Sequence, residues 1–171
     1  MPPARIPLVA AGVMLCSILA CSLGWNLPWI HRLENMKISI LLRQLKSIPS
    51  QSCLNNRTHF KFPWNRGNNS QTQGIQGTCF HQVMLQLIIN LFNTEDNDSR
   101  AAWNNALLDQ LLSRLDHSLE HLEEENLACP YLGTVARNYF QKINHYLKEK
   151  EFSPCAWEVV RGEMEVCLSL M

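Results

Sequence analysis

The stretch that decides the fold is residues 75–92, IQGTCFHQVMLQLIINLF, near the middle of a chain of 171 residues. It is apolar on nearly every side and shows no alternation of period two, so it reads as a helix and not as a strand. A helix that is apolar all round needs neighbours on all sides. We therefore expect residues 75–92 to form the central buried helix of a bundle, through Phe80, Val83, Met84, Leu85, Leu87, Ile88, Ile89, Leu91 and Phe92.

Apolar residues recur at helical spacing in four further segments. The first is expected from about Trp29 to Ser47, the second after an N-cap at Ser99 and the third after an N-cap at Thr134. The last begins at Ser153 and Pro154, because serine caps a helix and proline suits its first turn. The side chains predicted to face the core are Ile30, Leu33, Ile40, Leu41, Leu45 and Ile48; Leu108, Leu111, Leu112, Leu115, Leu119 and Leu122; Val135, Tyr139, Phe140, Ile143, Tyr146 and Leu147; and Ala156, Trp157, Val160, Met164, Cys167, Leu168 and Met171.

The last helix also has a predicted outward stripe, which consists of Glu158, Arg161, Gly162 and Glu165. Residues 49–74 carry no helical period and are expected to be a long loop. Long helices joined by an extended early connection favour overhand connections over an up-down bundle. The sequence therefore predicts one all-α domain, a five-helix bundle of the cytokine type with long overhand loops.

The N-terminus has the pattern of a secretory signal. Arg5 precedes an uncharged, mostly apolar run at residues 8–23, and Gly24 takes the last place of a small-residue cleavage site. The alternative is an uncleaved membrane anchor, but polar and small residues interrupt the run before it reaches the roughly 20 apolar residues that a spanning helix needs. We expect a signal peptide at residues 1–24 and a secreted domain at residues 25–171, with no membrane insertion after cleavage.

The charges balance, with 15 basic and 15 acidic residues. No excess of positive charge favours nucleic acid or an anionic membrane as a partner. In a secreted chain the sequons at Asn56, Asn68 and Asn97 are expected to be glycosylated, because all three fall in segments predicted to be loops.

Two C-terminal stretches, Tyr146–Lys150 (YLKEK) and Cys155–Arg161 (CAWEVVR), resemble the C-terminal signature of the type I interferons. The resemblance extends over almost the whole chain and is nearest to the alpha, omega and tau branch. The ending at Met171 without a basic tail is similar to the short delta-type interferons. Further matching stretches are Cys21–Gly24, Ser52–Leu54, Asn90–Phe92, Ala101–Trp103 and Tyr139–Gln141.

The resemblance implies a disulfide between Cys53 and Cys155, which ties the first long loop to the start of the last helix. A second bridge found in many relatives would need cysteines where this chain has Trp25 and Glu125, so both of its partners are missing together. Three other cysteines, Cys79, Cys129 and Cys167, are then unassigned.

Two arrangements of those three cysteines are open: one pair forms and leaves one thiol, or all three stay reduced. Cys79 and Cys167 also read as small core residues on helices. Cys129 lies in a predicted loop and is the cysteine expected to be reactive or to pair with another chain.

The resemblance further implies a function: a monomeric cytokine, not an enzyme, that binds the two chains of the interferon alpha/beta receptor and triggers JAK-STAT antiviral and antiproliferative signalling. No cofactor or metal is expected. One receptor chain binds tightly to the first loop and last helix, and the other binds more weakly to the opposite side. The positions that match the tight face are Leu54, Arg57, Arg161, Gly162, Glu165 and Leu170, and those that match the weak face are Asn90, Leu107 and Arg137.

Three of the matched positions have a plainer interpretation. Arg161 could be a solvated helix charge that pairs with Glu158 or Glu165, and Asn90 and Leu107 could be packing residues. The chain also departs from the alpha interferons, which have a methionine and a basic residue at the positions of Glu165 and Val166. These departures keep open a helical cytokine with a different receptor or with restricted potency.

A remote alternative comes from His117–His121, HSLEH, which fits the H-x-x-E-H pattern of some zinc peptidases. Its two imidazoles would be one helical turn apart, and Glu120 would act as the catalytic acid or base. Such enzymes need a further ligand and a cleft, and here the motif lies on the polar side of an amphipathic helix. A solvated helix face is the preferred interpretation.

Overall fold

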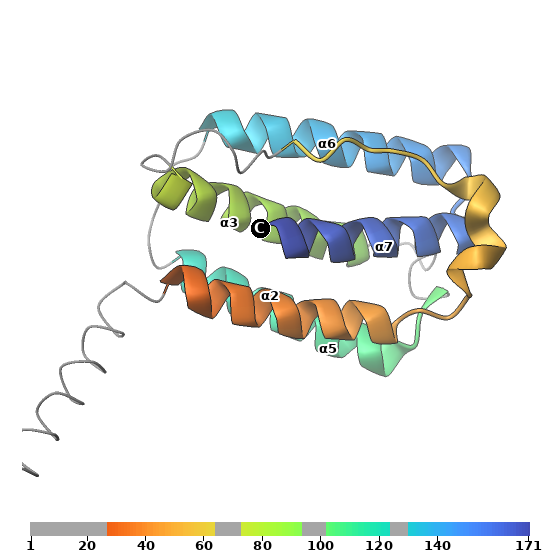
Figure 1. Cartoon of the computed structure of the whole chain (residues 1–171), viewed down its shortest axis with the longest axis horizontal. Coiled ribbons are helices and arrows are strands. Elements are labelled where there is room, and N and C mark those ends of the chain that lie inside the picture. Colours follow the sequence, from red (N-terminus) through yellow and green to blue (C-terminus); the bar gives the residue numbers. More distant parts are fainter. Residues whose placement is uncertain (1–26, 64–72, 94–101, 124–129) are drawn as a thin grey trace, which may run out of the picture. The chain divides into compact units, whose positions relative to one another are not determined.

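The computed structural model describes residues 27–63, 73–93, 102–123 and 130–171 (Figure 1). Within these ranges the secondary structure is helical and contains no strand, so the all-α prediction is confirmed. The expected signal peptide, Asn68, Asn97, Ser99 and Cys129 lie outside the described residues. The elements are α2 (Leu27–Gln44), the 3-10 helix η2 (Ser50–Asn56), α3 (Gln73–Phe92), α5 (Asn105–Glu123), α6 (Pro130–Glu149) and α7 (Pro154–Leu170).

The chain divides into two compact units, residues 1–34 and residues 35–171, and the boundary falls within α2. The packing described below lies within the second unit. None of the described helices is both long and apolar enough to cross a membrane.

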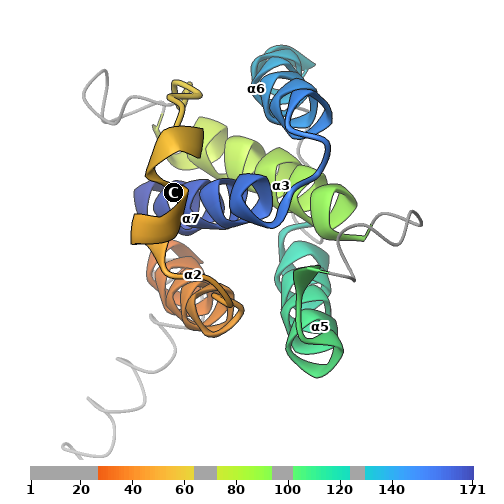
Figure 2. The same ribbon diagram turned by 90° about the vertical axis from the view of Figure 1, so that its right-hand side faces the viewer.

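Within residues 35–171, α3 is the central helix. It contacts both α5 and α6, and α7 contacts α6 and η2. Figure 2 shows α6 and α5 on opposite sides of α3. Because α3 has neighbours on several sides, its apolar side chains are covered on several sides, as we expected from the sequence.

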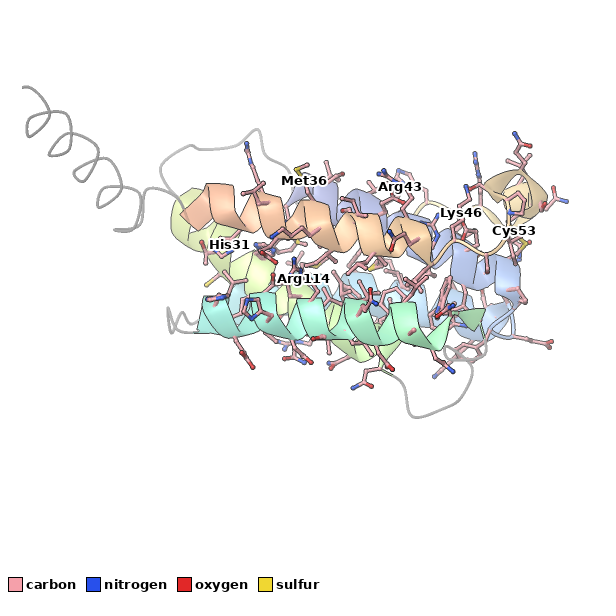
Figure 3. The ribbon with its side chains drawn as sticks, turned by 90° about the horizontal axis from the view of Figure 1, so that it is seen from below. His31, Met36, Arg43, Lys46, Cys53 and Arg114 are labelled. Carbon is pink, nitrogen blue, oxygen red and sulfur yellow. A yellow bond between two sulfur atoms is a disulfide. The ribbon has the colours of Figure 1, made fainter. Side chains whose placement is uncertain are left out.

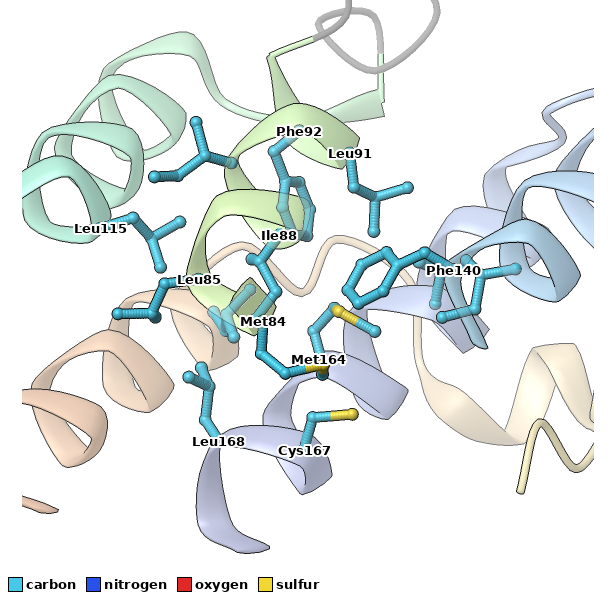
Figure 4. Close-up of a cluster of buried hydrophobic side chains, with 14 of the residues drawn as sticks. Met84, Leu85, Ile88, Leu91, Phe92, Leu115, Phe140, Met164, Cys167 and Leu168 are labelled. Carbon is cyan, nitrogen blue, oxygen red and sulfur yellow. The ribbon is translucent and has the colours of Figure 1, made fainter. Parts of the chain in front are cut away.

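The core forms where α3 meets α7, α5 and α6. Met84, Leu85 and Ile88 of α3 are fully buried, and Figure 4 shows them beside Met164 and Leu168 of α7. The predicted core positions of α5, α6 and α7 are also buried, except for Leu112, Val135 and Met171, which are partly exposed. Apolar periodicity was therefore sufficient to find the inner faces of three helices.

The predicted inner face of the first helix was wrong in part. Ile38, Leu42 and Leu45 are buried, whereas Leu33 and Ile40 are exposed. Positions 38, 42 and 45 follow the spacing of one helix face, and positions 33 and 40 follow that of another. Since α2 carries apolar side chains on both faces, periodicity alone could not decide which face turns inward.

Local side-chain chemistry sets the helix starts. Ser153 Oγ accepts a hydrogen bond from Ala156 N at 3.2 Å and Pro154 opens α7, which confirms the predicted cap. The α5 helix begins at Asn105, and Asn104 Oδ1 accepts from the backbone N–H groups of Ala106 and Leu107.

The start of α6 was predicted one turn too late. The helix begins at Pro130, and Thr134 lies inside it and does not cap it. Proline has no backbone N–H to leave unsatisfied and its fixed φ fits the first turn, so the helix extends to Pro130.

The first long connection contains structure that its sequence did not reveal. Residues 50–56 form η2, whose seven residues are too short to show a period. After η2 the chain runs along α6 (Figure 1), where the Phe60 ring meets Tyr146 edge to face at a centroid distance of 5.2 Å. Tyr146 also donates its hydroxyl hydrogen to Asn56 O at 2.5 Å. These contacts fix η2 and the residues after it against the bundle.

Candidate functional site

A disulfide joins η2 to the first turn of α7. Cys53 and Cys155 are bonded, with their Cα atoms 5.2 Å apart and 102 positions apart in sequence. Leu54 follows Cys53 directly, so this bond holds Leu54 beside the start of α7. The two elements that carry the predicted tight face are therefore in contact.

Two further cysteines, Cys79 and Cys167, lie among the described residues, and only the first is disulfide-bonded. Cys79 is buried on α3 and is disulfide-bonded, so a plain core thiol was the wrong interpretation for it. Cys167 is a free, buried thiol, in line with one pair formed and one thiol left. Its Sγ lies 3.0 Å from the Tyr139 hydroxyl, which also donates to Glu163, and burial raises the pKa of Cys167 to about 12. Cys167 is therefore a poor nucleophile.

The predicted outward stripe of the last helix is wrong at Arg161 and Glu158. Both are buried, at 4% and 5% exposure. Arg161 Nε donates to Glu158 Oε2 at 2.8 Å and Nη2 donates to Oε1 at 2.6 Å, a bidentate pair. Nη1 donates to the backbone oxygen of Leu42 on α2 at 3.3 Å. Arg161 thus joins α7 to α2. It pairs with Glu158 and Glu165, as its plainer interpretation expected, but it is buried and not a solvated helix charge.

Glu165 lies between two arginines. Its Oε2 accepts from Arg161 Nη1 at 3.0 Å, and its Oε1 accepts from Arg43 Nε at 2.9 Å. Burial alone would raise the pKa of Glu165, but the hydrogen bonds and charges of Arg43 and Arg161 outweigh it and hold the pKa below its usual value. The carboxylate therefore stays ionised and links α7 to Arg43 of α2, which Figure 3 labels.

Three ion pairs, Arg43–Glu165, Arg161–Glu165 and Arg161–Glu158, form one charge network. Arg43, Glu165, Arg161 and Glu158 alternate in sign, so their formal charges cancel. Ser50 Oγ of η2 lies 3.5 Å from Glu158 Oε1 at one end of the network. This charge network reaches α2, α7 and η2, three elements that come from distant parts of the sequence.

What remains exposed at the predicted tight face is mainly apolar. Leu54 on η2 is 53% exposed and Leu170 at the end of α7 is 38% exposed. Arg57 is exposed next to η2, and Gly162 is partly exposed with open space where a Cβ would lie. Val166 of α7, which the sequence analysis named only as a departure from the alpha interferons, is 52% exposed. The sequence could have identified Val166, because it lies one turn after Gly162 on the same helix face.

The three positions of the predicted weak face lie on three helices that pack together. Asn90 is exposed on α3 and accepts from Gln86 Nε2 at 3.0 Å. Leu107 is partly buried near the start of α5. Arg137 is exposed on α6, and its guanidinium lies next to the position that a Cβ of Gly133 would take. Both α5 and α6 contact α3, so the helices that carry Leu107 and Arg137 are each neighbours of the helix that carries Asn90.

The histidines of the HSLEH segment lie on the exposed side of α5. His117 and His121 are four positions apart, about one helical turn, and their Nε2 atoms lie 3.3 Å from each other. His117 and Glu120 border a shallow surface depression with Asp109, Ser113 and Asp116. Within the described ranges, no three metal-binding side chains come together.

The comparisons with known proteins name the family. The family model for the interferon alpha/beta domain matches residues 27–171. The chain is 40% identical to interferon alpha-H of Bos taurus, over 96% of this chain and 90% of that protein. It is 42% identical to interferon omega-1 of Homo sapiens, over 96% of this chain and 87% of that protein. The solved structure of zebrafish interferon 2 shares the fold, with a TM-score of 0.70 and 23% sequence identity, over 81% of this chain and 94% of that chain.

The fold and its disulfide-linked face define a helical cytokine. The chain belongs to the interferon alpha/beta family, the type I interferons. Members of this family are cytokines and not enzymes, so the zinc hydrolase hypothesis built on His117, Glu120 and His121 is set aside.

Proposed function

We propose that this chain is a secreted type I interferon that binds both chains of the interferon alpha/beta receptor as a monomer and so starts JAK-STAT antiviral and antiproliferative signalling. The observation that carries this proposal is the face formed by η2 and α7, which the Cys53–Cys155 disulfide and the charge network hold together. A binding surface that is rigid before binding loses less conformational freedom on binding.

Support for the tight chain comes from the exposed apolar residues of that face. Leu54, Val166 and Leu170 are large apolar side chains that face solvent. Exposed apolar side chains that gather on one surface are typical of protein interfaces. We assign the tight receptor chain to Leu54, Gly162, Val166 and Leu170, with Arg57 at the edge.

The weaker chain is assigned to the side that carries Asn90, Leu107 and Arg137. These residues lie on α3, α5 and α6, none of which contributes the residues of the tight face. Two receptor chains could then bind one interferon without competing for the same helices. Leu107 is the apolar member of this face and Arg137 its exposed cation.

Secretion and glycosylation complete the proposal. The signal peptide at residues 1–24 and the sequons at Asn56, Asn68 and Asn97 agree with each other, since glycans are attached to proteins that enter the secretory route. Among the three, Asn56 is in a described segment, at the end of η2 and next to Arg57.

The test is signalling by the secreted protein in cells of the organism that encodes it. An interferon-responsive reporter should be activated in normal cells and stay silent in cells that lack either receptor chain.

Leu170→Ala should reduce binding to the tight chain's ectodomain, and Arg137→Ala should reduce binding to the weaker chain's ectodomain. Lys142→Ala, which changes an exposed residue outside both faces, is the matched control. A receptor-independent response, or none at saturating protein, contradicts the proposal.

A second candidate function, an interferon of restricted potency, is favoured by one observation. Arg161 and Glu165, which the resemblance placed in the tight face, are committed to internal ion pairs. Fewer side chains are then left to contact the receptor. Dose-response curves against interferon alpha on the same cells separate the two candidates, because restricted potency requires a higher concentration for half of the maximal response.

A further inference from the structure

The residues that follow η2 form a strap, residues 57–63, that aromatic contacts fix along α6. The Phe60 ring meets Tyr146 edge to face at a centroid distance of 5.2 Å, and the Phe62 ring meets Tyr139 in the same way at 5.8 Å. Tyr139 and Tyr146 are seven positions apart on α6, about two helical turns. The strap therefore lies against two turns of α6, and its course can be followed in Figure 1.

Lys61 is exposed between these two aromatic contacts. Its φ of 58° lies in the left-handed region, which residues other than glycine rarely adopt. The rings on both sides of Lys61 are fixed to α6, so the backbone is held in this conformation while the lysine side chain stays in solvent. Lys142 is exposed on the same two turns of α6. It lies three positions after Tyr139 and four before Tyr146, which places it on the helix face that meets the strap.

Further cations continue from Lys142 along the outer side of α6. His145 and Lys148 follow it at intervals of three positions, so the three side chains form one row, and all three are exposed. The acidic neighbour of this row, Glu149, is paired with His145 at 3.0 Å. We call Lys61, Lys142, His145 and Lys148 the cationic band.

Charge is divided unequally between the two helices that flank α3. The strap and α6 together hold five lysine and arginine residues and one acidic residue, whereas α5 holds four acidic residues and one arginine. Figure 2 shows α6 and α5 on opposite sides of α3, so the two groups of charges are separated. The balanced total charge of the chain therefore conceals one positive surface, which attracts polyanions to the side of the strap and α6.

The surroundings of the cationic band do not suit a membrane or a single-stranded nucleic acid. Membrane surfaces are bound by apolar side chains that enter them beside the cations, and single strands by aromatic side chains that stack on the bases. Among the described side chains of the strap and α6, no large apolar one is exposed, and the four rings that fix the strap are packed in two pairs. Cations without such neighbours fit a chain of anionic groups on a polar backbone, which is the chemistry of a sulfated polysaccharide.

We propose that the cationic band binds a sulfated polysaccharide. None of its four residues belongs to the faces assigned to the two receptor chains, so this inference goes beyond the proposed function and does not depend on it. Binding at the band concentrates the protein on surfaces that carry the polysaccharide, because exposed lysines attract sulfate groups over a distance that salt limits.

The experiment measures binding of the mature chain to an immobilised heparin oligosaccharide, with the same oligosaccharide after chemical desulfation beside it. We expect binding to require the sulfates. The Kd should rise at least about tenfold between about 100 mM and about 300 mM NaCl, because screening weakens contacts between exposed charges. Lys61→Ala with Lys142→Ala should raise the Kd about tenfold, whereas Lys61→Arg with Lys142→Arg, which keeps both charges, should change it less than about threefold.

The matched control is Lys37→Ala with Lys46→Ala. It removes two exposed lysines, one on α2 and one just after it, and Figures 1 and 2 both place α2 on the far side of α7 from α6. The control should change the Kd for heparin less than about threefold. Both alanine variants should keep the melting temperature of the unmodified protein, which excludes a loss of folding.

Three results overturn the inference: no binding to heparin at about 100 mM NaCl, equal binding to the desulfated oligosaccharide, or equal losses in the two alanine variants. Tighter binding to phosphatidylserine vesicles or to DNA through Lys61 and Lys142 also overturns it, because the band would then serve another class of polyanion. A chain that binds heparin as expected but neither receptor ectodomain would support this inference and reject the proposed function.

Discussion

Arg161 and Glu158 form a bidentate ion pair inside the protein, with Nη2 and Oε1 2.6 Å apart and each side chain 5% exposed. A buried pair of this kind contributes little net free energy compared with apolar residues, but removing one partner leaves the other charge buried and unpaired. Arg161 is therefore far more sensitive to substitution than an exposed helix arginine.

Arg161→Ala should lower the free energy of unfolding by about 3 kcal/mol, because it leaves Glu158 without its partner in a desolvated place. If Arg161 were exposed, the same substitution would instead be expected to weaken receptor binding and leave the melting temperature unchanged. Chemical denaturation followed by circular dichroism measures it. Lys142→Ala, an exposed change on α6, should stay within about 0.5 kcal/mol of the unmodified protein. Equal stability of the two variants would show that the Arg161 pair is open to water.

Glu165 gives the stability a pH dependence with a definite sign. Its pKa is lower in the folded chain than its ordinary value of 4.5, so ionised Glu165 favours the folded state. The stabilisation is fully present above the unfolded-state pKa and is lost as the pH falls through the lower folded pKa. Glu165→Gln should therefore be less stable than the unmodified protein by about 1 kcal/mol at pH 7, and the difference should shrink below about pH 4.5.

Unfolding in urea at several pH values tests this prediction. Glu149→Gln is the matched control, because Glu149 also forms an ion pair on a helix, with His145 of α6, but both side chains of that pair are exposed. It should show a difference near zero at pH 7. If the difference for Glu165→Gln were to grow as the pH falls, the assigned direction of the pKa shift would be wrong.

The disulfide between Cys53 and Cys155 should carry a large part of the stability. The double variant Cys53→Ser with Cys155→Ser removes a crosslink between residues 102 positions apart, and the chain-entropy model assigns such a crosslink about 4.7 kcal/mol. Urea unfolding of both proteins without reductant measures the loss. Cys167→Ser, which removes a free thiol and no crosslink, is the comparison. A loss below about 1 kcal/mol would mean that η2 stays in place through its other contacts.

The sequence predicted most of the fold and only part of the site, for physical reasons. The periodicity of α3, α5, α6 and α7 was clear because each buries one broad apolar face or lies at the centre. On α2 the exposed Ile40 and the buried Ile38 are both apolar, so composition could not separate them. Arg161 was misplaced because a single helix projection treats a charge as exposed, and its burial depends on Leu42 O of α2, a partner 119 positions away. Val166 was read only as a departure from the alpha interferons, which have a basic residue there, so it was not included among the positions that match the tight face.

A glycan on Asn56 should limit access to the tight face. Asn56 ends η2, its backbone oxygen is held by the Tyr146 hydroxyl, and Arg57 follows it. Because the backbone is fixed there, a glycan would project beside Leu54 at the edge of the face. Asn56→Gln and Thr58→Ala each remove the sequon, so both should lose one glycan by mass spectrometry and bind the tight receptor chain with a Kd lower by about threefold, mainly through faster association. Asn97→Gln should lose a glycan without this gain. If neither sequon variant loses the mass of a glycan, Asn56 carries no glycan and Arg57 is open to the receptor.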